Sequence, residues 1–125
     1  METPLTAHRV LVVDDDPSVL ATYRRVLKRA GYHAELHNDP SAVLQDESLA
    51  QGVDLLLLDY KMPGMDGLSL LAELRHRECR ARCVLISAYL NDDVRTQADH
   101  LGVDCVLNKP VDIQQLRTTL SSLLA

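Results

Sequence analysis

A chain of 125 residues, 46% hydrophobic and 25% charged, has the size and composition of one globular domain rather than of two. Its net charge is −5 with acids and bases interspersed, which argues against direct binding to DNA or RNA. The amino terminus lacks a basic segment followed by an apolar stretch, and no apolar run approaches membrane-spanning length, so the sequence predicts a cytoplasmic protein without a membrane partner.

Five short apolar segments recur along the chain and are typical of β-strands. They cover residues 9–14, 33–37, 53–59, 83–87 and 104–108. The first, third and fourth segments are nearly continuous apolar runs, as in parallel strands that are buried on both faces. The segment at 33–37 is more polar, which is typical of a strand at the edge of a sheet.

Helical patterns follow each of these segments. Their apolar stripes span residues 19–30, 39–52, 68–74, 94–101 and 113–123. The first two helices begin with an Asp-Pro pair, at 16–17 and at 39–40, and are expected to end at Gly31 and Gly52. Strict alternation of strands and helices predicts a parallel sheet with helices on both faces, in a single domain over residues 1–125 with a short tail at 1–7.

Polar side chains stand where the strong strands end. Asp14 and Asp15 follow the first strand, Asp59 ends the third, Ser87 ends the fourth and Lys109 follows the fifth. Because ligands bind outside the carboxyl ends of strands in such sheets, these side chains are expected to converge. Three neighbouring carboxylates repel one another unless they hold a hard divalent cation such as Mg²⁺. The set is therefore suited to receive a phosphoryl group on a carboxylate, with the hydroxyl and the ammonium binding its oxygens.

Each of these residues has a simpler explanation when it is taken alone. We assign Asp16 as the cap of the first helix because Pro17 follows it. A serine at a strand end is often only polar, and Lys109 before Pro110 is by itself typical of a solvated loop. Asp59 differs, because it ends a run of four leucines where a turn needs no acid. The joint placement at four strand ends favours the functional interpretation.

The same motifs give the chain a close resemblance to the receiver domains of two-component response regulators. "VLVVDDDP" and "LDYKMPGMDG" match the acidic start and the phosphorylation-site motif of that family, and "ISA" and "NKP" follow at the family's spacing. The resemblance extends over essentially the whole chain. It implies a flavodoxin-like α/β fold, a three-layer (βα)5 sandwich with a parallel sheet of order 2-1-3-4-5.

The resemblance also implies roles for individual residues. Asp59 is expected to accept the phosphoryl group, and Ser87 and Lys109 are expected to bind it. The expected ligands of Mg²⁺, or of Mn²⁺ in its place, are Asp14 (largely through water), Asp15, Asp59 and the backbone carbonyl of Lys61. The Lys109–Pro110 peptide is expected to be cis.

The implied partners are those of a signalling protein. A histidine kinase or histidine phosphotransferase is expected to donate the phosphoryl group, and slow self-catalysed hydrolysis is expected to remove it, so the domain is not an enzyme in the ordinary sense. Phosphorylation is expected to switch the surface of the fourth helix, fifth strand and fifth helix. That surface would act on a downstream protein or a fused output domain, and it would form any phosphorylation-dependent homodimer.

The chain departs from the family's common pattern at the switch. Many receivers carry Tyr or Phe three residues before the lysine, where this chain has Val106, and Val111 replaces the Phe that often follows Lys-Pro. Tyr89 is the nearby aromatic residue that is placed to couple to the switch. An equally good interpretation is that Tyr89 and Lys61 shield the site from water, which would slow the loss of the phosphoryl group.

Two other functions stay open on the sequence. A haloacid-dehalogenase-type phosphatase would use Asp14 as nucleophile and Asp16 as acid and base, but it would leave Asp59 unexplained. A degenerate receiver would act only as an interaction module, which the complete residue set argues against. Substitution of Asp59 separates a receiver from a phosphatase. A nucleotide-binding module is disfavoured because its glycine-rich phosphate motifs are absent.

Overall fold

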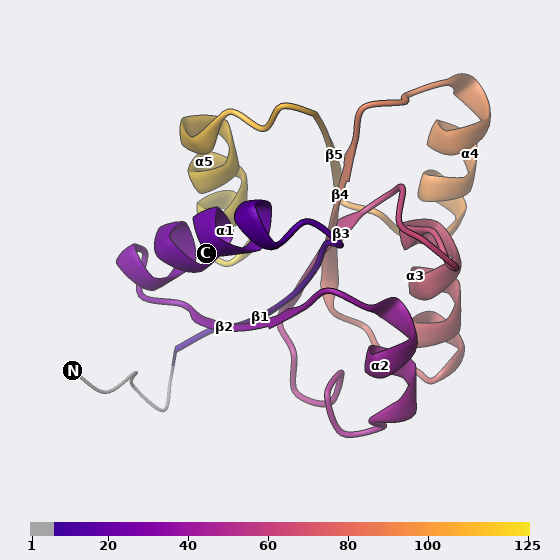
Figure 1. The fold of residues 1–125 in the computed structure, drawn as a ribbon, viewed down its shortest axis with the longest axis horizontal. Helices are drawn as coiled ribbons and strands as arrows, with labels where there is room; N and C mark the ends of the chain where they lie inside the picture. Colours follow the sequence, from indigo (N-terminus) through magenta and orange to yellow (C-terminus); the bar gives the residue numbers. More distant parts are fainter. Residues whose placement is uncertain (1–6) are drawn as a thin grey trace.

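The computed structural model describes residues 7–125 as alternating strands and helices (Figure 1). The strands are β1 (Arg9–Val13), β2 (His33–His37), β3 (Leu55–Asp59), β4 (Arg82–Ser87) and β5 (Cys105–Asn108). The helices are α1 (Pro17–Arg29), α2 (Pro40–Gln45), α3 (Gly67–His76), α4 (Asp92–His100) and α5 (Ile113–Leu123). The tail expected at 1–7 lies outside the described residues except for Ala7. Within the described range, no helix is long and apolar enough to cross a membrane.

The five strands form one parallel sheet in the order β2-β1-β3-β4-β5, which confirms the predicted topology. The central strands are in register, since Val13 pairs with Leu58 and Ser87 pairs with Asn108. Residues at or just beyond these positions therefore emerge at one edge of the sheet, which we call the carboxyl edge. The opposite edge, where the strands begin, is the amino edge.

Helices cover both faces of the sheet, with α1 and α5 on one face and α2, α3 and α4 on the other (Figure 1). The four leucines of β3 alternate between these layers. Leu56 and Leu58 pack toward α2, α3 and α4, whereas Leu55 and Leu57 pack toward α1 and α5. All four are buried, and each stabilises the fold by about 1.5 to 3 kcal/mol relative to exposure. Burial on both faces explains the continuous apolar run in the sequence.

Every helix begins at a residue whose side-chain oxygen accepts a hydrogen bond from a backbone N–H of the first turn. These caps are Asp16, Asp39, Asp66, Asn91 and Asp112. The caps satisfy N–H groups that have no partner within the helix. The Asp-Pro pairs predicted the starts of α1 and α2 correctly.

Helix α2 is shorter than the sequence predicted, because it ends at Gln45 and not near Gly52. Asp46 leaves the helical conformation, with φ of −103° and ψ of 97°. Its carboxylate accepts hydrogen bonds from the N–H of Ser48 at 3.0 Å and from the hydroxyl of Ser48 at 2.6 Å. This local bonding competes with the helix, so the chain turns and runs toward β3 along the amino edge.

Strand β2 lies at one edge of the sheet, as its polar sequence predicted. Glu35, in the middle of the strand, accepts a hydrogen bond through Oε1 from Nη2 of Arg9 in β1 at 2.9 Å. Nε2 of His33 lies 3.9 Å from the same oxygen. The edge strand is thus held to β1 by side chains as well as by its backbone.

Candidate functional site

Three carboxylates meet at the carboxyl edge, as the sequence predicted. Asp14 and Asp15 follow β1, Asp59 ends β3, and one oxygen of each lies within 4.8 Å of the others. Asp14 is 1% exposed and Asp59 is 3% exposed, whereas Asp15 is open to solvent. Two ionisable groups are therefore buried where the core could have placed apolar side chains.

The two buried carboxylates are only half satisfied. Oδ1 of Asp14 accepts a hydrogen bond from the N–H of Asp16 at 2.9 Å, and Oδ1 of Asp59 accepts one from Nζ of Lys109 at 2.9 Å. Oδ2 of Asp14 and Oδ2 of Asp59 are buried without a hydrogen-bond partner. Such atoms are rare in folded proteins. Clustered anionic oxygens with free lone pairs are the ligands that Mg²⁺ prefers, so the donor set fits this cation.

Burial also changes how these groups titrate. It raises the pKa of Asp14 to about 6 and raises the pKa of Asp59 above its ordinary value. Burial alone would lower the pKa of Lys109, but the hydrogen bond to Asp59 and the nearby acids outweigh this effect and raise it. Lys109 therefore stays charged at neutral pH. One ammonium faces three carboxylates, which leaves the site with excess negative charge.

Ser87 ends β4 and is 1% exposed. Its hydroxyl accepts a hydrogen bond from the N–H of Tyr89 at 2.9 Å and donates one to the carbonyl of Tyr89 at 3.1 Å. Both bonds tie the hydroxyl to the loop between β4 and α4. The sequence placed Ser87 at this edge correctly, but it gave no sign of this bonding. The Lys109–Pro110 peptide is cis, as expected.

A cavity of about 510 Å³ opens beside the three acids. Its lining residues are Asp15, Asp16, Asp59, Lys61, Met62, Pro63, Ala88, Tyr89 and Lys109. Nζ of Lys61 lies 5.0 Å from the ring centroid of Tyr89, a cation–π contact between two residues that line the cavity. Met62, Pro63 and Ala88 belong to the motifs "LDYKMPGMDG" and "ISA", but their residue types alone indicate no role in a site, and their place in the lining comes from the structure.

Val106 lies apart from this cavity. It is half-buried in β5 and packs against the apolar layer under α2, α3 and α4. Tyr89, by contrast, is 60% exposed at the cavity itself. Of the two residues considered for the switch, only Tyr89 therefore lines the site.

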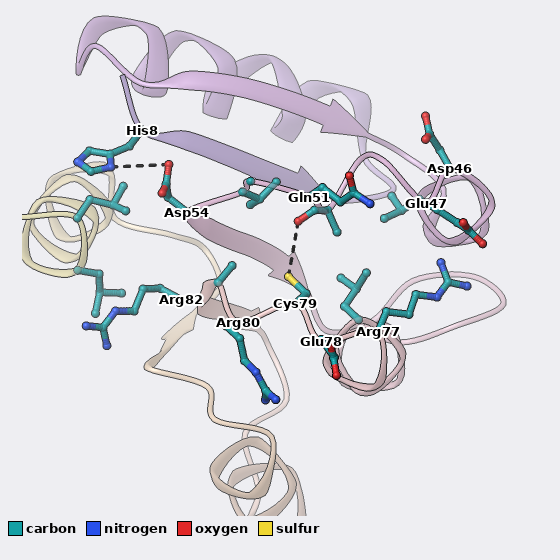
Figure 2. Close-up of a pocket in the computed structure, with 18 of the residues that line it drawn as sticks. His8, Asp46, Glu47, Gln51, Asp54, Arg77, Glu78, Cys79, Arg80 and Arg82 are labelled. Atoms are coloured by element: carbon teal, nitrogen blue, oxygen red, sulfur yellow. Dashed lines mark hydrogen bonds and ion pairs between the residues drawn. The ribbon is translucent and has the colours of Figure 1, made fainter. Parts of the chain in front are cut away.

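A larger cavity of about 820 Å³ lies at the amino edge (Figure 2). Its walls mix acids with arginines, and the thiol of Cys79 points toward the carbonyl of Ala50 at 3.9 Å (Figure 2). Asp54, on its wall, accepts a hydrogen bond from the N–H of Arg9 at 2.8 Å. This cavity lies at the opposite end of the strands from the unpartnered carboxylates.

Comparison with known proteins agrees with this geometry. Residues 10–121 match the family model of the response regulator receiver domain. The chain belongs to the receiver domain family. Receiver domains are signalling modules rather than catalytic enzymes, and the Asp14, Asp15 and Asp59 cluster is typical of their Mg²⁺ site.

Relatives of two lengths match this receiver. The transcriptional regulatory protein PrrA of Mycobacterium tuberculosis is 33% identical over 124 residues, which is 99% of this chain but 53% of PrrA. The chain thus spans about half the length of that relative. Sporulation initiation phosphotransferase F of Bacillus subtilis is 29% identical over 117 residues, and the match covers 93% of each chain.

Solved structures match the whole fold. A CheY-like receiver domain from Methanospirillum hungatei superposes with a TM-score of 0.87 at 24% identity, over 95% of this chain and 94% of that chain. The receiver domain of the Francisella response regulator 1452 superposes with a TM-score of 0.82 at 26% identity, over 93% and 95% of the two chains. Both comparisons support the flavodoxin-like topology that the sequence predicted.

Proposed function

We propose that Asp59 accepts a phosphoryl group from a partner's phosphohistidine, in a two-component or phosphorelay pathway. The observation that carries this proposal is Oδ2 of Asp59, which is buried and has no hydrogen-bond partner while Lys109 holds Oδ1. Its free lone pairs are available to form a bond to phosphorus. As that P–O bond forms, the P–N bond to the histidine breaks and its electron pair leaves with the nitrogen.

The proposed ligands of Mg²⁺ are Asp14, Asp15, Asp59 and the backbone carbonyl of Lys61, and Mn²⁺ is expected to substitute. Support for this set comes from the three clustered carboxylates and from the two unpartnered oxygens. A bound Mg²⁺ supplies positive charge to the phosphoryl oxygens during transfer. Lys109 supplies a second positive charge, because its Nζ already lies 2.9 Å from Oδ1 of Asp59 and 3.8 Å from Oδ2 of Asp14.

The phosphoryl group is proposed to act on Ser87. It adds about −1.5 to −2 charges and strong acceptor oxygens beside the hydroxyl. Ser87 would donate to one of these oxygens and release the two hydrogen bonds that it makes with Tyr89. Freeing the loop after β4 biases the surface of α4, β5 and α5 between two conformations. Val106 stands where many receivers carry a Tyr or Phe that couples to the switch. In this chain Tyr89 is instead proposed to be the aromatic side chain that moves together with Ser87.

Lys61 and Tyr89 are proposed to limit the approach of water to the phosphorylated Asp59. Both residues line the cavity and contact each other, so self-catalysed hydrolysis should be slow. The variant Tyr89→Ala should lose its phosphoryl group several-fold faster than wild type, measured by intact mass after removal of the phosphodonor. Tyr32→Ala, a change at a half-buried tyrosine that does not line this cavity, serves as the control. An unchanged rate in Tyr89→Ala would contradict the shielding role.

The proposed partners are a histidine kinase or a histidine phosphotransferase upstream and an effector downstream. PrrA is a longer protein, whereas the Bacillus subtilis phosphotransferase has nearly the length of this chain. The output therefore passes either to a fused domain or to a separate protein. A homodimer formed on phosphorylation would use the same surface of α4, β5 and α5.

A phosphatase that uses Asp14 is disfavoured by its neighbour Asp16. In that mechanism Asp16 would donate a proton, which requires a pKa near neutrality. Asp16 accepts a hydrogen bond from the hydroxyl of Ser18, which has the larger effect, and another from the N–H of Ser18. Both lower the pKa of Asp16. A degenerate receiver is disfavoured because the acids, the hydroxyl and the lysine are all present at the carboxyl edge.

Intact mass tests the proposal directly. The protein is incubated with acetyl phosphate and Mg²⁺, beside Asp59→Asn and beside a wild-type sample with a chelator. Wild type with Mg²⁺ should gain one phosphoryl group, and the other two samples should gain none. Labelling of Asp59→Asn would show that another carboxylate is the acceptor. If Asp59 is the acceptor but accepts phosphoryl groups only from a protein, a phosphorylated histidine phosphotransferase will label wild type where acetyl phosphate fails.

A further inference from the structure

The two ends of helix α4 are held to the domain in different ways. Among the side chains of the helix, only Val94 and Ala98 are buried, so its apolar contact with the layer beneath is thin. Segments with little buried apolar contact open and move at low free-energy cost. Hydrogen bonds at the two ends therefore decide which part of the helix is able to move.

Arg75 of α3 fastens the carboxyl end of α4. Its Nε donates to the carbonyl of Leu101 at 3.0 Å and its Nη2 donates to the carbonyl of Gly102 at 3.3 Å. Its Nη1 donates to the carbonyls of Cys79 at 2.9 Å and Ala81 at 2.7 Å. The last carbonyls of a helix lack partners within it and carry partial negative charge, which suits a guanidinium. One side chain thus joins α3, the loop after α3 and the end of α4.

At the amino end of α4, Val94 is buried and Leu90 packs against the same apolar layer, and the side-chain hydrogen bonds at this end are local ones. In the loop of residues 88–91, the backbone of Tyr89 makes its two hydrogen bonds with Ser87. Asn91 caps the helix by accepting a hydrogen bond from the N–H of Val94 at 2.9 Å, but this bond lies within the helix start and does not reach the sheet. Besides the apolar contacts of Leu90 and Val94, the polar contact of this end with β4 is therefore the same hydroxyl that is proposed to bind the phosphoryl group.

We propose that Arg75 fixes the carboxyl end of α4 as the pivot of the switch. The inference rests on the proposed function of Asp59 and Ser87. When Ser87 turns to the phosphoryl group, the amino end of α4 loses its two tethering bonds while the four bonds of Arg75 are unchanged. The helix then swings about its carboxyl end. The surface that a partner reads is the loop 88–91 with the first turns of α4, and Arg75 is the positioning residue that confines the movement there.

Hydrogen–deuterium exchange on the full chain tests this pivot. Samples contain Mg²⁺ with or without beryllofluoride, which mimics a phosphoryl group on a carboxylate. In wild type, beryllofluoride should change exchange in peptides covering 88–95 and leave 99–104 unchanged. In Arg75→Gln, exchange in 99–104 should rise about tenfold in both states, because hydrogen bonds to a charged donor are lost. The beryllofluoride response should also spread from 88–95 into 99–104.

Arg77→Gln is the matched control. Arg77 also projects from the end of α3, but its Nη1 donates to the carbonyl of Leu44 in α2 at 2.7 Å. This variant should keep the wild-type pattern, with the response confined to 88–95. If Arg75→Gln fails to fold, Arg75→Lys keeps the positive charge, lacks the planar fork of donors, and is measured in the same way.

A purely structural role for Arg75 predicts a different result. Exchange would rise and the melting temperature would fall, but the beryllofluoride response would stay confined to 88–95 in Arg75→Gln, and this outcome would overturn the pivot. An equal response at both ends of α4 in wild type would overturn it as well. Intact mass with acetyl phosphate on the same samples separates the two proposals. A wild type that is phosphorylated but responds uniformly removes only the pivot, whereas a wild type that neither acetyl phosphate nor a phosphorylated histidine phosphotransferase labels removes both.

Discussion

At the amino edge of the sheet, Asp54 and Asp104 each stand directly before a strand and accept a hydrogen bond from a backbone N–H of a neighbouring strand. The donors are the N–H of Arg9 and the N–H of Cys83, both at 2.8 Å. At the carboxyl edge, Asp14 and Asp59 are buried and each keeps one oxygen without a partner. The same residue type in the same sheet is therefore satisfied at one edge and left unsatisfied at the other.

Glu35 also has a buried oxygen, Oε2, without a hydrogen-bond partner, so it is the clustering of Asp14, Asp15 and Asp59 together with this difference that marks the carboxyl edge as the candidate site. A satisfied carboxylate contributes hydrogen bonds to the native state. A buried carboxylate oxygen without a hydrogen-bond partner lowers the stability of the native state, even where the Lys109 ammonium lies close to the carboxylate. The carboxyl edge of the sheet therefore lowers the stability of the metal-free domain. Binding of a cation or a phosphoryl group would recover that loss, which couples the occupancy of the site to folding.

The largest effect is expected at Gly67, which begins α3 beside the acid cluster. A Cβ atom at this position would collide with the backbone carbonyl of Asp59, and the N–H of Gly67 is held by the carbonyl of Tyr60 at 2.7 Å. Gly67→Ala should lower the free energy of unfolding by about 3 kcal/mol, measured by urea denaturation. Gly64→Ala has open space around the new Cβ but a φ of +83°, so it should cost only about 1 kcal/mol. Equal losses in the two variants would contradict the steric explanation.

The next largest effect concerns how the free energy of unfolding depends on pH through the buried acid Asp14. The pKa of Asp14 is about 6 in the native state and 3.8 when unperturbed, so the native state binds its proton more tightly. The stability that this proton contributes is complete below pH 4 and is lost as the pH rises through about 6. In metal-free buffer, Asp14→Asn should raise the free energy of unfolding at pH 7 by about 2 kcal/mol and flatten this part of the profile. If Asp14→Asn is less stable than wild type at pH 7, the proposed difference between the acids of the two sheet edges is wrong.

The opposite sign is expected at the amino edge. Asp104→Ala removes the acceptor of the N–H of Cys83 and of Nη1 of Arg82, which lies 3.2 Å from Oδ1. The free energy of unfolding should fall by about 1 kcal/mol in thermal or urea denaturation. Asp104→Asn keeps one oxygen as an acceptor and should lose less. If Asp104→Ala were stabilising, the amino edge would resemble the carboxyl edge and the comparison would fail.

The smallest effect concerns Glu78, which follows α3 at the amino edge with a φ of +67°. Glycine adopts this left-handed conformation without steric cost, whereas other residues do not. Glu78→Gly should therefore raise the free energy of unfolding by about 0.5 to 1 kcal/mol. Glu78→Ala keeps the Cβ atom and should gain nothing, which separates the backbone effect from the loss of a charge. Equal gains in the two variants would favour the charge instead.

The fold and the acid cluster were predictable because both follow from patterns along the chain. The alternation of strands and helices predicted a parallel sheet with helices on both faces, the resemblance to receiver domains supplied the strand order, and strand ends placed Asp14, Asp15, Asp59 and Lys109 together. The end of α2 was not predictable from its thin apolar stripe, because the local bonding of Asp46 decided it. A side chain that competes with the backbone of its own helix leaves the hydrophobic pattern unchanged.

The hydrogen bonds around α4 could not be predicted from the sequence, for a different reason. Arg75 binds four backbone carbonyls, and a carbonyl is present at every residue, so no residue type reveals the partner. The direction of the Ser87 hydroxyl depends on the path of the loop to Tyr89, and the spacing of motifs does not encode that path. The sequence therefore predicted the acid cluster, Lys109 and the helix cap Asp16, but not the hydrogen bonds that Arg75 and Ser87 make with distant or loop backbone.

The polar edge strand β2 has a consequence for how copies of this domain meet. An exposed strand edge is a template on which another chain can add, and such growth leads toward aggregates. If β2 of a second copy aligned antiparallel about its midpoint, two Glu35 carboxylates would face each other and repel. At the other edge, β5 has only four residues and offers little to pair with. Charge at one edge and shortness at the other discourage growth of the sheet, so contacts between copies are directed to the helical surfaces.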